Sequence, residues 1–378
     1  MDNLTHSLVG LTAAKAGLER LSPGATVLCV LAANAPDSDI LVLLFGDRWD
    51  FLQHHRGITH SFIGTALLAL LLPLIFYGVD RLWARLRQRS PQTNLRGLMI
   101  ASFIVSATHP LLDWTNNYGI RFLLPWNPRW FYGDLVFIVD PFLWLIFGSA
   151  AFLLASRTKT GKVVWIALAA IVTAVILVGP RGTDLPNAVR IFWIAGLVLT
   201  VVLYMMRARE RWGAKIAFVS FALVLVYWTA LGVAHARALD RCREEAQKMS
   251  RGETLARIAA MPTLANPLLW DCVFETDKAT YRFHTRLNDP NSIGGFVRYA
   301  KPSGQLAAAL QSVAQEKPAR VFLGFARFPV ARLSDPSCAS QTLVQLADLR
   351  YTEPGASRGT FALELPVDCP AQVDKEGR

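Results

Sequence analysis

Apolar residues gather in long uninterrupted runs up to about Ala234 and become sparse beyond it. A hydrocarbon core of ~30 Å needs roughly 20 residues of helix to cross it. Lipid offers no hydrogen-bond partner to an unpaired backbone group, so each long run predicts a membrane-spanning helix. The six runs are Ser61–Val79, Gly97–Leu112, Leu135–Ala155, Val163–Gly179, Ile191–Met206 and Ile216–Ala234.

Shorter apolar segments precede these runs, at Leu4–Leu18 and Ala25–Ala35, with Ile40–Phe45 following. Each is short for a separate span. They predict a helical hairpin that packs against the bundle or is partly inserted.

The pattern changes after Ala234. A charged helical stretch is expected from His235 to Ala260, ended by Pro262 and Pro267. Beyond Trp270 the apolar residues alternate with period two, which indicates strands. The predicted strands are Val273–Leu287, Gly295–Tyr299, Arg320–Leu333, Thr342–Tyr351 and Gly359–Leu365.

These patterns predict a mainly α protein, a polytopic α-helical membrane bundle with a C-terminal soluble α+β domain. The expected division is an N-terminal hairpin with polar loops over residues 1–60, a six-helix transmembrane bundle over 61–234, and the α+β domain over 235–378.

Composition agrees with a membrane protein. Hydrophobic residues make up 53% of the chain and charged residues 18%, against roughly 45–50% and 25% in soluble domains. Disorder is therefore excluded. The net charge of +11 could suggest nucleic acid, but Lys and Arg sit mostly in short clusters between apolar runs. Such clusters set membrane orientation, so we expect no nucleic-acid partner.

The basic clusters predict the orientation, because Lys and Arg are enriched in cytoplasmic loops. The larger set alternates with a smaller one that holds Arg48, Arg56, Arg121, Arg129, Arg181 and Arg190. The larger set, expected in the cytoplasm, comprises Lys15, Arg20, Arg81, Arg85, Arg87, Arg89, Arg96, Arg157, Lys159, Lys162, Arg207, Arg209, Arg211 and Lys215. The loops at 46–60, 114–134 and 180–190, and everything after Ala234, should then face outward.

Four of the five cysteines fall in this terminal region: Cys242, Cys272, Cys338 and Cys369. An outward domain would allow disulfides among them, and buried thiols are the alternative.

Five of the seven histidines lie in the first third of the chain, accompanied by acids. They form four clusters, which are Thr5-His6-Ser7, the segment Asn34 to Asp39, the segment His54 to Ser61, and His109-Pro-Leu-Leu-Asp113. On the predicted orientation all four lie at the outward rim, His6 included if the first short helix runs inward.

The spacing of these residues suits a metal site. His109 and Asp113 are i and i+4, so on a helix they leave the same face, although Pro110 between them predicts an irregular turn. Asp37 and Asp39 follow Pro36, where alternate positions of an extended turn would point the same way. His55 and His60 flank a turn that contains Gly57.

A single histidine on an apolar helix is more often structural than a ligand, and an isolated carboxylate is usually a cap or a solvated charge. Four such clusters at one rim are harder to explain that way, since a charge at mid-membrane costs at least ~2.5–3.5 kcal/mol on insertion scales. A divalent metal site is the favoured interpretation. Histidine and carboxylate ligands without cysteine suit Zn, Mn or Fe.

The motifs resemble a known family. The opening Asp-Asn-Leu-Thr-His-Ser, the Pro-Asp-x-Asp, the His-His-Arg-Gly-x-Thr-His-Ser and the His-Pro-Leu-Leu-Asp-Trp are similar, in order over about residues 1–145, to the bacterial inner-membrane YdjM-like family of metal-dependent hydrolases. That family is distantly similar to zinc-dependent phospholipase C. The resemblance implies the metal ligands His6, Asp37, His55, His60, His109 and Asp113, and location in the inner membrane. Phospholipase C also uses a His-x-x-x-Glu pair, which this sequence lacks, so the number of metal ions stays open.

Hydrolysis of a lipid-linked phosphoester or ester at the outer rim is the simplest expected activity. Asp134, in a segment that also resembles the family, or an unligated Asp39 would accept the proton, and Arg56 would hold developing negative charge. Asp140 lies deeper and is either functional or bonded to backbone groups near Pro141.

Two other classes of protein stay open. An intramembrane metalloprotease is disfavoured, because the sequence lacks His-Glu-x-x-His. A scaffold, or a transporter of metal ions or protons, could use the same cluster without catalysis. The residues do not indicate a protein partner.

Overall fold

The computed structural model describes residues 1–179, 185–337, 341–356 and 361–368. Arg181, Cys338, Cys369 and the start of the strand expected at Gly359 lie outside these ranges. The chain divides into two compact units. The first comprises 1–39, 56–235 and 262–267, and the second comprises 40–55, 236–261 and 268–378.

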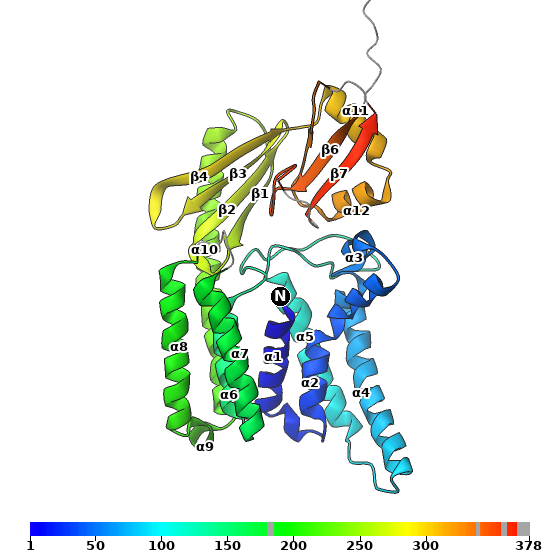
Figure 1. The fold of residues 1–378 in the computed structure, drawn as a ribbon, viewed down its shortest axis with the longest axis vertical. Helices are drawn as coiled ribbons and strands as arrows, with labels where there is room; N and C mark the ends of the chain where they lie inside the picture. The colour runs from blue at the N-terminus through cyan, green and yellow to red at the C-terminus, as the bar shows by residue number, and fades with distance from the viewer. Residues whose placement is uncertain (180–184, 338–340, 357–360, 369–378) are drawn as a thin grey trace, which may run out of the picture. The chain divides into compact units, whose positions relative to one another are not determined.

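The first unit is helical (Figure 1). It contains the short 3-10 helices η1 (Leu18–Arg20) and η3 (Ile58–His60), the beginning of the 3-10 helix η2 (Ala35–Leu44), and the short helix α9 (Ala208–Trp212). Its longer helices are α1 (Asn3–Lys15), α2 (Ala25–Asn34), α4 (Phe62–Leu86), α5 (Leu95–Trp114), α6 (Pro141–Ala155), α7 (Lys159–Val178), α8 (Asn187–Met205) and the first part of α10 (Lys215–Met249).

Six helical stretches among the described residues are long and apolar enough to cross a membrane. Five of them match predicted runs. The sixth is Ala25–Leu44, where α2 continues directly into η2 beside Pro36, whose missing N–H prevents a regular α-helical bond. The run expected from Leu135 yields only the fifteen-residue helix α6, because Asp140 caps it and Pro141 begins it.

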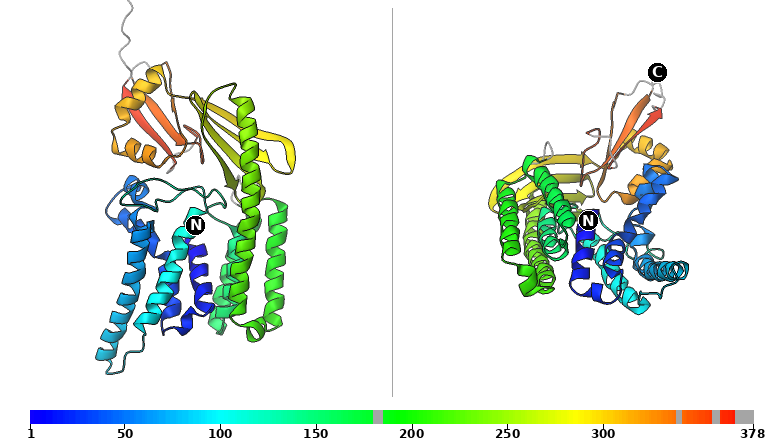
Figure 2. Two further views of the ribbon diagram at one scale, coloured as in Figure 1. Left: turned by 180° about the vertical axis from the view of Figure 1, so that it is seen from behind. Right: turned by 60° about the horizontal axis from the view of Figure 1, so that its bottom comes forward.

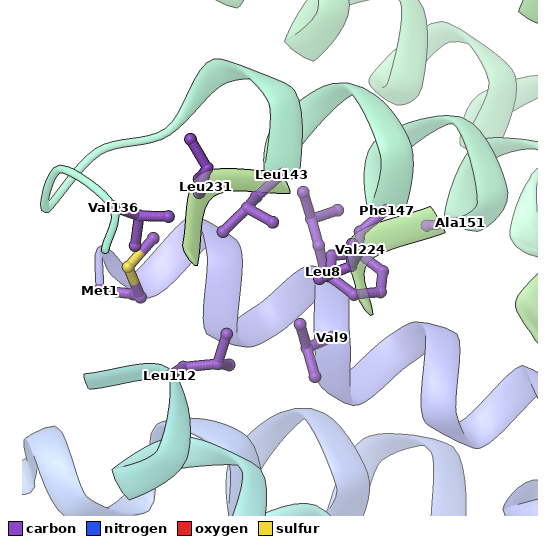
Figure 3. Packing of buried hydrophobic residues seen from close by; sticks show 10 residues of the cluster. All are labelled: Met1, Leu8, Val9, Leu112, Val136, Leu143, Phe147, Ala151, Val224 and Leu231. Atoms are coloured by element: carbon purple, nitrogen blue, oxygen red, sulfur yellow. The ribbon is translucent and has the colours of Figure 1, made fainter. Parts of the chain in front are cut away.

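The core of this unit forms where α1 meets α5, α6 and α10. Figure 3 shows Leu8 beside Phe147 and Met1 beside Val136, with Val9 and Leu112 in the same cluster. Gly10 permits α1 to approach α2 closely, because a Cβ there would lie 2.6 Å from the Cys29 carbonyl oxygen. This packing fixes α1 against the helices that carry the other polar clusters.

The predicted cytoplasmic loops share one end of the bundle. The η1 turn meets the start of α5, since Asn94 N donates to Ser22 Oγ at 2.9 Å. Figure 1 shows the α1–α2 turn, the α4–α5 connection and α9 at that end, and the N-terminus at the opposite end. The basic clusters of these loops therefore lie away from the start of α1, as the orientation requires.

The second unit contains two antiparallel sheets. One sheet has the order β1-β2-β3-β4, with the strands Leu255–Thr263, Asn266–Thr276, Ala279–Arg286 and Asp289–Ala300. The other has the order β5-β6-β7, with the strands Pro329–Leu333, Gln341–Asp348 and Ala362–Asp368. The short helices α3 (Arg48–His54), α11 (Gly304–Val313) and α12 (Lys317–Phe325) belong to the same unit.

The expected fold class is confirmed, with local corrections. Helix α10 ends at Met249 and β1 begins at Leu255, so the helix expected up to Ala260 is wrong there. Figure 2 shows α10 as one continuous helix. The first half of the strand expected over Arg320–Leu333 is helix α12, and only Pro329–Leu333 is strand.

Candidate metal centre

Four side chains from three segments converge at one end of the helices of the first unit. They are Asp37 on η2, His60 on η3, and His109 and Asp113 on α5, and one ligand atom from each lies within 4.8 Å of the others. Helix α5 continues through Pro110, which corrects the irregular turn expected there, so His109 and Asp113 do share one helical face.

The separations between these atoms match a coordination shell. His60 Nε2 lies 3.2 Å from Asp37 Oδ1 and 3.4 Å from Asp113 Oδ2. His109 Nε2 lies 3.6 Å from Asp37 Oδ1 and 3.5 Å from Asp113 Oδ2. Metal–ligand bonds of about 2.0–2.1 Å in a tetrahedron place ligand atoms about 3.3–3.4 Å apart. The four separations therefore fit ligand atoms around one ion, and the two remaining pairs lie within 4.8 Å.

The outer contacts of His109 orient its ring for such a role. Its Nδ1 lies 2.6 Å from the Ala33 carbonyl oxygen, which can only accept a hydrogen bond. The Nδ1–H therefore donates to that carbonyl, and the lone pair of Nε2 points at the two carboxylates. His109 Nε2, Asp37 Oδ2 and Asp113 Oδ2 have no hydrogen-bond partner. Facing lone pairs in a buried site repel unless a cation lies between them.

His60 is oriented in a similar way. Asp39 Oδ2 lies 3.3 Å and Thr59 Oγ1 3.0 Å from its Nδ1, on the side of the ring away from the cluster. In metal sites, the histidine ring nitrogen that does not bind the metal is typically hydrogen-bonded to a carboxylate. Burial disfavours the charged form of His60, but the nearby carboxylates of Asp113 and Asp37 outweigh it and raise the pKa of this histidine.

Asp37 and Asp39 do not point the same way, which corrects the extended turn expected for them. Both lie on η2, and a helix with three residues per turn sends positions i and i+2 in different directions. Asp37 therefore reaches His60 Nε2, while Asp39 reaches His60 Nδ1 and accepts a hydrogen bond from Arg56 N at 3.1 Å.

Arg56 is buried beside Asp113. Its Nη2 donates to Asp113 Oδ1 at 3.1 Å, and its Nη1 donates to Asn116 Oδ1 at 2.8 Å. The guanidinium also stacks over the Tyr118 ring, 4.6 Å from its centroid. The backbone of Arg56 is left-handed, with φ of 52°. These contacts hold Asp113 in place and balance part of its charge.

His6 joins the cluster from α1. Its ring stacks on His109 with centroids 3.8 Å apart, and its Nε2 lies 3.4 Å from Asp113 Oδ1. Both ring nitrogens of His6 lack a hydrogen-bond partner. The Met1 amino group also contacts Asp113 Oδ1. His6 thus faces the oxygen of Asp113 opposite to the one that His60 and His109 approach.

His55 and Asp134, two further residues predicted for the site, are not among the four side chains grouped above. His55 ends α3 in the second unit and stacks on Phe51, with ring centroids 4.7 Å apart, and its role as a ligand stays a prediction. Asp134 is buried, and its segment is hydrogen-bonded to the end of α5, where Leu135 N and Val136 N donate to the Thr115 carbonyl oxygen at 2.8 and 3.0 Å. Its role as a base also stays a prediction.

Asp140 is the N-cap of α6. Its Oδ1 accepts from Phe142 N at 2.8 Å and from Leu143 N at 3.3 Å, and its Oδ2 accepts from Tyr227 Oη at 2.9 Å. These contacts favour the structural alternative for this acid. Sequence reasoning missed Asn116 and Thr59, although each directly neighbours or closely follows a predicted residue.

Comparison with known proteins covers the same part of the chain. A family model described as YdjM inner membrane protein matches residues 1–183. The chain is 26% identical over 155 residues to the uncharacterized protein YfhP of Bacillus subtilis, an alignment that covers 38% of this chain and 43% of that protein. It is 28% identical over 143 residues to the inner membrane protein YbcI of Escherichia coli, with 37% and 76% covered. No solved structure matches.

Proposed function

Residues 1–183 belong to the YdjM inner membrane protein family, and from this premise we propose that the chain is a metal-dependent hydrolase of the inner membrane. The protein is multi-pass and carries a buried His/Asp cluster that could hold a metal ion. The observation that supports the proposal most is the convergence of Asp37, His60, His109 and Asp113, in which His109 Nε2, Asp37 Oδ2 and Asp113 Oδ2 have no hydrogen-bond partner.

Zinc is the proposed ion, with Mn or Fe as alternatives, because a set of two imidazoles and two carboxylates suits it. When bound, the ion would supply Lewis acidity, lowering the pKa of a water molecule toward about 7. Asp37 is the ligand that water would most easily replace, since its side chain is 14% exposed while those of His60 and His109 are fully buried.

The other residues would position and move protons. Asp39 holds the His60 ring through Nδ1, and Arg56 holds Asp113. Asp134 is the proposed proton acceptor, supported by the pinning of its segment to Thr115, two residues beyond Asp113. The Arg56 guanidinium already donates hydrogen bonds to Asp113 and Asn116, which supports a role in positioning Asp113 more than direct binding of the substrate.

The proposed substrate is a lipid-linked phosphoester or ester at the outer face. The Met1 amino group contacts Asp113 of the cluster, and the N-terminus lies at the end of the bundle away from the basic loops, which supports the outward orientation. Cys242 and Cys272 form a disulfide in the second unit. Disulfides persist in oxidising compartments, which supports a periplasmic or extracellular C-terminal region.

A non-catalytic metal site is the second candidate. Four protein ligands complete a tetrahedron, and structural zinc sites are closed in this way, whereas catalytic ones keep a position open. A transporter is less favoured, because Asp140, the deeper acid, is occupied as a helix cap.

The test is hydrolysis of a panel of phosphodiester and ester lipids by the purified chain in the presence of Zn, Mn or Fe. The proposal expects at least one lipid to be cleaved by wild type and not by His60→Ala. Asp134→Asn should keep bound metal but lose turnover. A chain that binds metal yet cleaves none of the panel would favour the structural site.

A further inference from the structure

A large apolar cavity lies inside the first unit, on the other side of α1 from the metal centre. Its volume is about 610 Å³, and residues of α1, α6, α7 and α8 line it. Ligand pockets in proteins typically measure about 300–1,000 Å³. Leu4 and Leu8 face this cavity from α1, whereas His6 on the same helix stacks on His109.

Most polar side chains in the cavity wall are already paired within the protein. Ser149 Oγ and Thr200 Oγ1 are 2.7 Å apart, and Trp193 Nε1 donates to Thr173 Oγ1 at 3.0 Å. The indole of Trp144 donates to Asp2 Oδ1 at 3.0 Å. A polar ligand would find these groups engaged and would lose its own hydration, so the wall favours hydrocarbon.

The cavity is continuous with the lipid-facing surface of the bundle. Ile166 on α7 and Val201 on α8 line it and are 61% and 55% exposed. Both helices are candidate membrane spans. The apolar molecules that reach such an opening in a bilayer are the chains of its lipids.

Small residues leave the space open. A Cβ added at Gly148 on α6 would meet only Leu8 Cδ1, at 3.9 Å, which is ordinary van der Waals contact. Leu145, next to it, instead packs against Gly196 of α8, where a Cβ would lie 2.4 Å from Leu145 Cδ2. Helices α6 and α8 thus touch at Gly196 and leave room beside Gly148.

We propose that this cavity binds one acyl chain of a membrane phospholipid. The chain enters from the bilayer between α7 and α8 and lies against Leu8, Leu145 and Leu197, while its headgroup stays at the membrane surface. This binding is separate from any hydrolysis at the metal centre and does not depend on it.

The experiment uses the full chain reconstituted in vesicles of phosphatidylethanolamine and phosphatidylglycerol that contain a phospholipid with a diazirine in mid-chain. Irradiation and peptide mass spectrometry locate the crosslinks, and native mass spectrometry after exchange into detergent counts the lipids retained. Gly148→Leu places a side chain in the cavity. Gly78→Leu on α4 is the control, because a Cβ at Gly78 meets nothing within 4 Å.

We expect wild type and Gly78→Leu to retain one phospholipid, with crosslinks on Leu145 and Leu197. In Gly148→Leu, retention and these crosslinks should fall by roughly sixteenfold if the new side chain displaces two methylenes, since each displaced methylene changes affinity about fourfold. Leu197→Trp, which fills the same space from α8, should act alike if Gly148→Leu fails to fold. Crosslinks confined to outward faces, retention of detergent only, or equal retention in all variants would overturn the proposal.

Discussion

Replacing Arg56 by Met tests how the metal centre is held together. Arg56 Nη2 donates to Asp113 Oδ1 at 3.1 Å, and the two side chains are 3% and 1% exposed. Methionine keeps much of the side-chain length but removes the charge and the donors. Asp113 would then keep a buried negative charge with less compensation.

The expected decrease in the free energy of unfolding is large for a single substitution. Breaking a buried ion pair by removing one partner costs about 3–5 kcal/mol, and we expect the lower end of this range because the Met1 amino group still contacts Asp113. Asn116 Oδ1 also loses the guanidinium donor at 2.8 Å, which adds to the cost. Arg129, an exposed arginine of the neighbouring loop, is the matched control, and Arg129→Met should stay within about 0.5 kcal/mol of wild type.

Zinc should reduce the difference in the free energy of unfolding between Arg56→Met and wild type. A cation held at Asp113 Oδ2 compensates the same carboxylate, and a ligand that binds only the folded state stabilises it by mass action. The assay is chemical unfolding in detergent, followed by tryptophan fluorescence, with a chelator and with excess zinc. A loss equal to that of Arg129→Met, or one that zinc leaves unchanged, would refute this reasoning.

Three further predictions concern other contacts. Asp39→Asn should weaken metal binding about 10–100-fold without abolishing it, because Asp39 orients His60 and is not one of the four grouped side chains. A competition titration with a zinc dye measures this, and unchanged affinity would contradict the role. His284 has a raised pKa because it is hydrogen-bonded to Asp271, so this pair stabilises the second unit below the unfolded pKa of about 6.5, and the stabilisation is lost as pH rises through the folded pKa. In thermal unfolding, wild type should be more stable than His284→Gln at low pH and lose this advantage as pH rises. The effect should be small because the pair is partly exposed, and a pH-independent difference would contradict the prediction. Reducing the disulfide between Cys242 and Cys272, which are 30 residues apart, should cost about 3–4 kcal/mol; a Cys242→Ser variant that unfolds at the same denaturant concentration would speak against this contribution.

The sequence was sufficient for the membrane helices but not for every boundary. Long apolar runs predicted five of the six candidate spans, because hydropathy alone decides them. Ala25–Leu44 was missed since Pro36 divides its pattern. The strand β1 was missed because Leu255–Thr263 contains helix-favouring Arg and Ala, and its pairing with β2 overrides that preference.

The convergence of some of the candidate residues was predictable from the sequence, and the groups that orient them were not. Histidines and acids are costly in a bilayer, so His60, His109 and Asp113 stood out by type and spacing. The Ala33 carbonyl that orients His109 carries no sequence signal, because every residue has one. The different directions of Asp37 and Asp39 depend on the 3-10 geometry of η2, which the pattern did not indicate.

Metal content of the purified chain tests the central claim most directly. Elemental analysis of protein prepared without added chelator should find a divalent metal, zinc foremost, bound in stoichiometric amount to wild type and to His54→Ala, a control at an exposed histidine. The double variant His60→Ala with His109→Ala should lose it while keeping its helical circular dichroism. Equal metal content in the folded double variant, or none in wild type even after incubation with zinc, manganese or iron, would contradict the account.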